Sequence, residues 1–196
     1  MAAAAPVFAE TFRILALGDS LTAGYGLSKD DAFTMQLERA LKAGKLNVKV
    51  INGGVSGDTS AGGLARLGWA LTDEPQLILI ELGANDGLRG LDPRETERNL
   101  DSIISKSKKA GLTVVLSGMR APPNLGREYV SEFNTIFTRL ASKHDITLDP
   151  FFLSGVVAIP ELNQDDAIHP NAKGVAIIVK RLAPLLKGLI EPKLVN

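Results

Sequence analysis

The chain has 196 residues, of which 45% are hydrophobic and 22% are charged, proportions typical of one well-packed domain and not of a disordered protein. Lys plus Arg and Asp plus Glu number 22 each, with no run of like charge, which argues against a nucleic-acid-binding protein. Cysteine is absent and only two histidines are present, which excludes disulfides, thiolate metal ligands and a cysteine nucleophile and leaves little for a zinc site.

The chain begins with a small, apolar segment, residues 1–10, of sequence Met-Ala-Ala-Ala-Ala-Pro-Val-Phe-Ala-Glu. It lacks the charged start and the full apolar core of an export signal, but Val7-Phe8-Ala9 resembles a signal cleavage site. Two interpretations stay open: a disordered tail, or the remnant of a removed export signal. No apolar stretch reaches the roughly 18 residues of a membrane span. We therefore expect a single domain over residues 11–196 and no stable membrane insertion.

Five short apolar runs rich in β-branched residues predict strands, and they alternate with apolar residues at helical spacing. The strands are expected at residues 14–17, 48–52, 77–82, 113–117 and 146–148. The helical patterns fall at residues 33–41, 100–104, 133–140 and 175–182, and Gly44 and Gly111 stand where two of these helices should end. Because parallel strands need crossover connections, this alternation predicts an α/β fold with helices on both faces of a parallel sheet.

Polar clusters follow three of the predicted strands, and a fourth precedes the last helix. In chain order they are Gly18-Asp19-Ser20-Leu21-Thr22, Gly53-Gly54-Val55-Ser56-Gly57-Asp58-Thr59, Gly83-Ala84-Asn85-Asp86 and Asp165-Asp166-Ala167-Ile168-His169-Pro170. Each cluster taken singly is explained by a turn or a helix cap. Turns and caps do not explain why all four clusters are expected at the same edge of the sheet. This edge, beyond the carboxyl ends of the strands, is where such sheets bind ligands.

The four clusters resemble the four sequence blocks of the SGNH (GDSL) hydrolases, in the family's order and across nearly the whole chain. Within that family, residues 83–90 and 120–129 are most similar to the bacterial thioesterase I/lysophospholipase L1/arylesterase group. One departure is Ala84, where the group often has a second glycine. The resemblance implies a flavodoxin-like three-layer α/β/α sandwich with a five-stranded parallel sheet.

A serine hydroxyl needs a positioned base to become a nucleophile. The spacing of Asp166 and His169 lets a tight turn hold the carboxylate against one ring nitrogen and leave the other for Ser20. We therefore predict Ser20 as the nucleophile, activated by the Asp166–His169 pair, because Asp165 is one residue out of the family spacing. The second histidine, His144, is expected to face solvent near a helix C-terminus. No metal and no cofactor are expected.

The resemblance further implies an oxyanion hole made by the backbone N–H groups of Ser20 and Gly57 and by the side-chain amide of Asn85. An amide donates hydrogen bonds without carrying charge, and a glycine lets the backbone approach the substrate closely. The Gly53-Gly54 pair offers other glycines, but the register of the surrounding sequence favours Gly57. Two further acids adjoin the site and are expected to bond turn amides and hold the loops in shape: Asp19 and Asp86.

Residues 118–129 follow the fourth predicted strand and contain two prolines. One interpretation is an ordinary connection between a strand and a helix. The resemblance implies instead a mobile loop that shapes acyl-chain binding, with Pro122, Asn124, Leu125 and Gly126 as substrate-binding residues. A larger or smaller residue at Leu125 is then expected to change the preferred acyl-chain length.

The reaction that the resemblance implies is hydrolysis of carboxylic esters through an acyl-enzyme. Candidate substrates are short to medium acyl or aryl esters, thioesters and lysophospholipids. Two alternatives stay open: an esterase of the same fold acting on acetylated carbohydrate, and a non-catalytic flavodoxin-like binding domain. The aromatic content of 5% offers no platform for sugar stacking, which favours acyl esters. A small acyl ester is the expected binding partner and nucleic acid is not, while the formation of a homo-oligomer stays open.

The related group is often exported, so we expect a periplasmic or secreted enzyme, with a cytoplasmic one as the alternative.

Overall fold

The computed structural model describes residues 11–194, and its centre is one sheet of five parallel strands. The strands are β1 (Phe12–Gly18), β2 (Val48–Gly54), β3 (Leu77–Glu81), β4 (Thr113–Ser117) and β5 (Thr147–Asp149). Their order in the sheet is β2-β1-β3-β4-β5, with every neighbouring pair parallel. This is the flavodoxin-like order, in which the crossovers change direction between β1 and β3. The predicted parallel α/β fold is confirmed.

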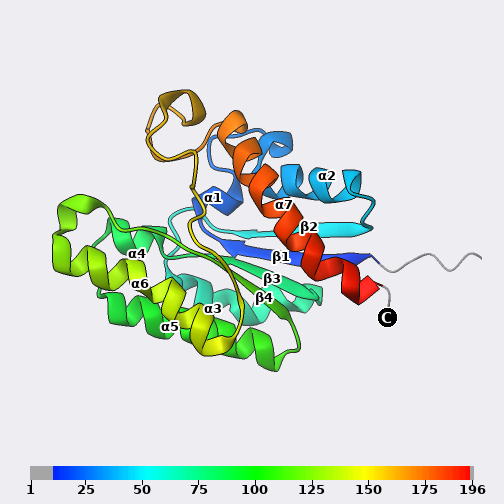
Figure 1. The fold of residues 1–196 in the computed structure, drawn as a ribbon, viewed down its shortest axis with the longest axis horizontal. Helices are drawn as coiled ribbons and strands as arrows, with labels where there is room; N and C mark the ends of the chain where they lie inside the picture. The colour runs from blue at the N-terminus through cyan, green and yellow to red at the C-terminus, as the bar shows by residue number, and fades with distance from the viewer. Residues whose placement is uncertain (1–10, 195–196) are drawn as a thin grey trace, which may run out of the picture.

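Helices cover both faces of the sheet (Figure 1). The helices α2 (Phe33–Ala43) and α7 (Ala172–Leu194) pack together on one face, beside the short α1 (Ser20–Ala23). The helices α3 (Ser60–Ala70), α5 (Pro93–Lys109) and α6 (Arg127–His144) pack in sequence on the other, and α4 (Ala84–Leu88) is a short turn of helix after β3. Single 3-10 turns occupy Lys29–Asp31, Leu71–Asp73, Pro123–Leu125 and Pro160–Leu162. None of the helices within residues 11–194 is long and apolar enough to cross a membrane.

The helix α3 was not among the predicted helices. Its buried positions include Ser60, Gly63 and Ala70, and only Leu67 is a large apolar residue. Small side chains let α3 approach the sheet closely, and a Cβ on Gly63 would stand 2.2 Å from a methyl group of Leu82. The expected stripe of large apolar residues is therefore missing, although the helix is well packed.

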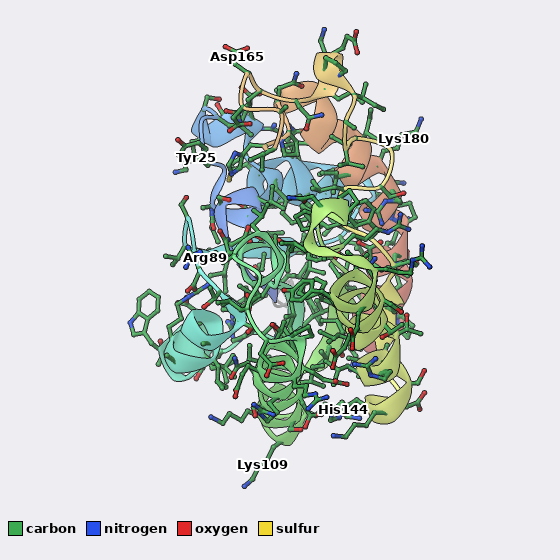
Figure 2. The ribbon with its side chains drawn as sticks, turned by 90° about the vertical axis from the view of Figure 1, so that its left-hand side faces the viewer. Tyr25, Arg89, Lys109, His144, Asp165 and Lys180 are labelled. Carbon is green, nitrogen blue, oxygen red and sulfur yellow. The ribbon has the colours of Figure 1, made fainter. Side chains whose placement is uncertain are left out.

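The central strands are buried on both faces, which fixes where polar groups can emerge. Residues 14–17 of β1 and 77–81 of β3 have almost no exposed surface. The polar loops that follow β1, β2 and β3 meet at the carboxyl edge of the sheet, as the fold class requires. Figure 2 looks onto this edge, with Tyr25, Arg89 and Asp165 on it and His144 well away from Asp165.

Candidate active site

Ser20 is the first residue of α1, directly after β1. The carboxylate of Asp19 caps this helix by accepting a hydrogen bond of 3.0 Å from the N–H of Leu21. Gly18 leaves no room for a side chain, because a Cβ at this position would lie 2.1 Å from the hydroxyl oxygen of Thr22 and 2.5 Å from a carboxyl oxygen of Glu81. The turn from strand to helix is therefore tight, and it places Ser20 at the end of the sheet with its side chain partly exposed.

His169 and Asp166 lie on the short loop that precedes α7. One carboxylate oxygen of Asp166 accepts hydrogen bonds of 2.9 Å from the backbone N–H groups of His169 and Ile168. The second oxygen lies 2.6 Å from Nδ1 of His169. The two backbone donors, His169 first, lower the pKa of Asp166 to about 2. The carboxylate is therefore ionised at neutral pH and accepts the Nδ1 proton, which leaves Nε2 free to act as a base.

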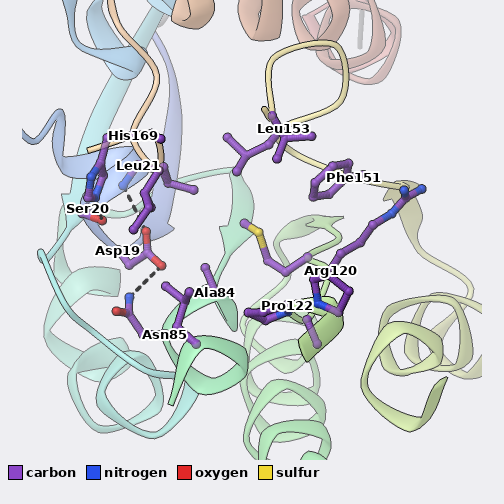
Figure 3. Close-up of a pocket in the computed structure, with 17 residues that line it drawn as sticks. Asp19, Ser20, Leu21, Ala84, Asn85, Arg120, Pro122, Phe151, Leu153 and His169 are labelled. Atoms are coloured by element: carbon purple, nitrogen blue, oxygen red, sulfur yellow. Dashed lines mark hydrogen bonds between the residues drawn. The ribbon is translucent and has the colours of Figure 1, made fainter. Parts of the chain in front are cut away.

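The imidazole meets the serine hydroxyl across 149 positions of sequence, with Nε2 of His169 lying 2.8 Å from Oγ of Ser20 (Figure 3). Asp166, His169 and Ser20 thus form one continuous hydrogen-bonded chain. The ring of Tyr25 packs against the imidazole, with ring centroids 4.7 Å apart. By contrast Asp165 is exposed and does not contact the imidazole through any hydrogen bond within residues 11–194.

The three hydrogen-bond donors expected to form the oxyanion hole lie in the segments that follow β1, β2 and β3. The backbone N–H groups of Ser20 and Gly57 have no acceptor within the described part of the chain, so both are free to bind a ligand. Gly57 adopts a positive φ of 80°, which glycine tolerates without strain. The amide of Asn85, on α4, donates to the carboxylate of Asp19 through a hydrogen bond of 3.0 Å.

The other glycines near this loop have a structural role. Gly53 and Gly54 complete β2 and do not enter the loop. A Cβ on Gly54 would lie 2.2 Å from the backbone nitrogen of Ala23, so this glycine permits close contact between β2 and α1.

The two acids expected to hold the loops in shape do make such contacts. The carboxylate of Asp86 accepts hydrogen bonds from the backbone and hydroxyl of Ser60 and from the hydroxyl of Thr96. It thereby joins α3, α4 and α5 behind the loops of the site. Asp19 binds the amide of Asn85 as well as its own helix N-terminus.

Beside Ser20 a cavity of about 440 Å³ opens to solvent, a size suited to a small-molecule substrate. Figure 3 shows Ser20 and His169 at one end of it and Phe151 and Arg120 at the other. Its lining is mostly apolar: Leu21, Ala84, Leu88, Met119, Ala121, Pro122, Pro123, Phe151, Leu153, Val157 and Ile168. The polar lining consists of Arg120 and of Asp19, Ser20, Asn85 and His169 at the other end. Such a cavity fits an acyl or aryl group with its ester bond at Ser20.

The predicted substrate-binding loop only partly lines this cavity. Pro122 does so, whereas Asn124, Leu125 and Gly126 do not. The 3-10 turn Pro123–Leu125 carries the chain away towards the start of α6, so Leu125 and Gly126 border a separate surface depression. Met119 and Ala121 also line the cavity; both lie in the segment 118–129 that was expected to border the pocket, but neither was among the substrate-binding residues named from the sequence.

The second histidine lies outside this site. His144 is at the C-terminal end of α6, as expected, but its side chain is only 13% exposed and does not face solvent freely. Its Nε2 atom lies 2.6 Å from the carboxylate of Asp101, which also binds Lys143 at 2.8 Å. These contacts make it a link between α5 and α6. Within residues 11–194 no three His, Cys, Asp or Glu side chains are grouped so as to hold a metal ion.

Comparison with known proteins defines the class. Residues 16–177 match the GDSL-like Lipase/Acylhydrolase family, so the chain belongs to this family of SGNH hydrolases. An arylesterase of Vibrio mimicus is 43% identical over 172 residues, covering 87% of this chain and 86% of the relative. The thioesterase 1/protease 1/lysophospholipase L1 of Escherichia coli (strain K12) is 40% identical over 179 residues, covering 91% of this chain and 85% of the relative. The crystal structure of AlinE4, an SGNH-hydrolase family esterase, is 44% identical, with a TM-score of 0.79 over 93% of this chain and 98% of that one.

Within the family the protein is a serine hydrolase that cleaves carboxylic esters, of the esterase, thioesterase and lysophospholipase type. This assignment excludes the non-catalytic binding domain that the sequence alone left open.

Proposed function

We propose that Ser20, His169 and Asp166 form the catalytic triad, and that this enzyme hydrolyses short to medium acyl or aryl esters through an acyl-enzyme. The observation that carries the proposal is the hydrogen-bonded chain from Asp166 through His169 to the Ser20 hydroxyl. The apolar cavity that begins at Ser20 supports an acyl or aryl substrate. Thioesters and lysophospholipids present the same kind of acyl group and differ from simple esters only in the leaving group, a thiolate or an alkoxide that carries the phospholipid headgroup.

The reaction follows from this geometry. As Oγ of Ser20 attacks the ester carbonyl carbon, its proton passes to Nε2 of His169 and the carbonyl oxygen becomes an oxyanion. The ionised Asp166 stabilises the imidazolium that forms. His169 then gives the proton to the departing alkoxide or thiolate, which leaves Ser20 acylated. Water attacks this acyl-enzyme with the same base, and the acid product is released with Ser20 restored.

The oxyanion needs donors that are in place before charge develops. We assign this role to the backbone N–H groups of Ser20 and Gly57, both without another acceptor within residues 11–194, and to the amide of Asn85. Asn85→Ala should therefore lower kcat for a p-nitrophenyl ester about 10²- to 10³-fold with little change in KM. An effect confined to KM would mean that Asn85 only binds substrate.

The cavity lining gives a test of acyl-chain selection. Ala121→Leu adds volume where the apolar wall follows β4, and it should shift preference towards shorter acyl chains. We expect kcat/KM for a p-nitrophenyl octanoate to fall about tenfold or more relative to the acetate, because one extra methylene group that a hydrophobic pocket must accommodate changes kcat/KM by about this much. Leu125→Ala, outside the cavity, is the matched control and should leave the ratio unchanged. The same shift in both variants would contradict the assignment of the cavity.

An acetyl esterase for carbohydrate is the second candidate, and the apolar lining of the cavity disfavours it. Comparison of acetylated sugars with p-nitrophenyl acyl esters distinguishes the two, and faster turnover of the sugars would reverse our preference.

We also propose, on the family resemblance, that residues 11–196 form a single domain and that the enzyme works in the periplasm or outside the cell. The sequence allowed two interpretations of residues 1–10, a disordered tail or the remnant of an export signal, and these residues lie outside the described part of the chain. Cell fractionation with an activity assay tests the location.

A further inference from the structure

Two carboxyl groups lie completely buried at the Ser20 loop, and the triad mechanism uses neither of them as an acid or a base. Asp19 precedes Ser20, and Glu81 is the last residue of β3, paired with Gly18 of β1. One oxygen of Glu81 accepts a hydrogen bond of 2.7 Å from the hydroxyl of Thr22 and a longer one of 3.4 Å from the N–H of Asp19. The other oxygen has no partner within the described part of the chain. A buried pair of acids at this point requires an explanation, because burial of charge is costly.

The surroundings of Glu81 favour its protonated form over the carboxylate. Burial, and then the charge of Asp19, raise the pKa of Glu81 well above its usual range, and the hydrogen bonds from Thr22 and Asp19 oppose this only in part. An ionised carboxylate with one oxygen wholly unpaired would be far more costly in this place than a neutral carboxyl. Two acids this close also share a single charge more easily than they carry two.

Asp19 is the member of the pair that ionises. Burial raises the pKa of Asp19 to about 6, while donation from the N–H of Leu21 and the amide of Asn85 oppose the rise. The charged groups around it are Glu81, His169, which lowers its pKa, and Asp58, which raises it. Asp58 is itself bound by Arg66 at 2.6 Å, and Arg66 also donates to the carbonyl of Gly18. These surroundings favour the negative charge of the pair on Asp19 rather than on Glu81.

The ionisation of Asp19 decides which way the amide of Asn85 points. A carboxylate only accepts hydrogen bonds, so it binds the NH2 group of Asn85 and rejects its carbonyl oxygen. One N–H is thereby engaged with Asp19, and the second N–H of the same group is left for the oxyanion. A protonated Asp19, or an amide in its place, donates as well as accepts. It then tolerates the flipped Asn85, whose carbonyl oxygen repels an oxyanion.

We propose that Asp19 is a positioning residue whose ionised carboxylate holds Asn85 in the orientation that donates to the oxyanion. The neighbouring Glu81 is protonated, so the Asp19–Glu81 pair carries one negative charge, and that charge lies on Asp19. The inference rests on the proposed oxyanion role of Asn85. The two remain separable, because Asn85→Ala alone tests the role of Asn85. Asp19→Asn tests whether Asp19 acts through Asn85.

The central experiment is a double-mutant cycle of Asp19→Asn and Asn85→Ala, with kcat and KM measured on a p-nitrophenyl ester. Asp19→Asn should lower kcat about 10- to 10²-fold, part of the loss expected for a missing oxyanion donor, with KM nearly unchanged. In the Asn85→Ala background the same change should alter kcat by no more than about twofold, because residues that act through one another are not additive. Full additivity, or a wild-type kcat in Asp19→Asn, would overturn the proposal. Asp101→Asn, a remote acid between α5 and α6, is the matched control and should keep wild-type kinetics.

A second measurement does not depend on the folding of an Asp19 variant. In the His169→Gln protein, where the imidazole no longer titrates, the side-chain NH2 signals of Asn85 should shift with pH in NMR spectra as Asp19 ionises. The signals are assigned by their loss in Asn85→Ala. Adding Glu81→Gln should leave the midpoint of this titration unchanged, since the introduced amide has the same charge as the protonated acid. Signals of Asn85 that ignore pH between about 5 and 8, the range around an ordinary histidine pKa, would refute the coupling. A lower midpoint in Glu81→Gln would refute the proton on Glu81.

Discussion

Ser20→Ala is expected to abolish ester turnover while leaving the fold intact. Removal of the nucleophile eliminates the acyl-enzyme route, and we expect kcat on a p-nitrophenyl ester to fall by about 10⁴-fold or more. The side chain is partly exposed and small, so the free energy of unfolding should change by no more than about 0.5 kcal/mol. Activity assays and thermal unfolding of the same preparation measure both effects.

A fluorophosphonate probe gives an independent check on the nucleophile. The wild-type protein should acquire one covalent adduct, located at Ser20 by peptide mass spectrometry, and Ser20→Ala should acquire none. Retained turnover in Ser20→Ala, or a label on another serine, would refute the assignment of the nucleophile.

Asp166→Asn should be nearly as damaging, although asparagine and aspartate have almost the same shape. An asparagine amide donates to Nδ1, which favours the tautomer with the proton on Nε2, where the Ser20 proton has to go. From the size of this effect in other serine triads we expect kcat to fall about 10⁴-fold. The pKa of Asp166, lowered to about 2 first by the backbone N–H of His169, means that the native carboxylate stays ionised at every pH above about 4.

Asp165→Asn is the matched control for this prediction. Asp165 is the adjacent acid on the same loop, is exposed, and has no hydrogen bond or ion pair to other residues within 11–194. Its replacement removes the same charge without touching His169, so kcat should change by no more than about twofold. Equal losses in Asp165→Asn and Asp166→Asn would indicate a general effect of charge and would contradict the triad.

Most of the fold follows from periodicity alone, because the strands are buried on both faces. The runs at residues 77–82 and 113–117 agree with β3 and β4 almost to the residue. The ends of β1 and β2 were placed too short, since Arg13 and Gly53 interrupt the apolar pattern but still pair in the sheet. Close packing through small side chains explains why α3 was missed: this kind of contact leaves no apolar stripe in the sequence.

For the site, the sequence indicated which residue types meet but not how they face one another. The family blocks indicated Ser20, His169 and Asp166, which lie in one hydrogen-bonded chain. The outline of the cavity depends on how the chain turns after β4, which motifs do not encode. The segment 118–129 was therefore expected to border the cavity as a whole, with Leu125 and not Met119 named as a substrate-binding residue, whereas Met119 lines the cavity and Leu125 does not. Glu81 was overlooked, although one signal was present. The single acid inside the apolar run 77–82 predicts a buried carboxyl, as the structure shows for Glu81.

The proposed base His169 and its acid Asp166 lie on one short surface loop, far in sequence from helix α1, which carries the proposed nucleophile Ser20. Residues 165–168 of this loop are exposed, so the loop buries little surface. Polar contacts hold its ends: the N–H of Gln164 donates to the carbonyl of His169 at 2.8 Å, and the side-chain amide of Gln164 donates to the carbonyls of Tyr25 at 2.8 Å and Pro170 at 3.0 Å. Regions with few buried contacts open at a lower free energy than the whole molecule. The enzyme should therefore have a reversible inactive state on heating, in which the loop has come away while the sheet stays intact. Thermal loss of activity is then a local event that precedes melting of the domain, and it recovers on cooling.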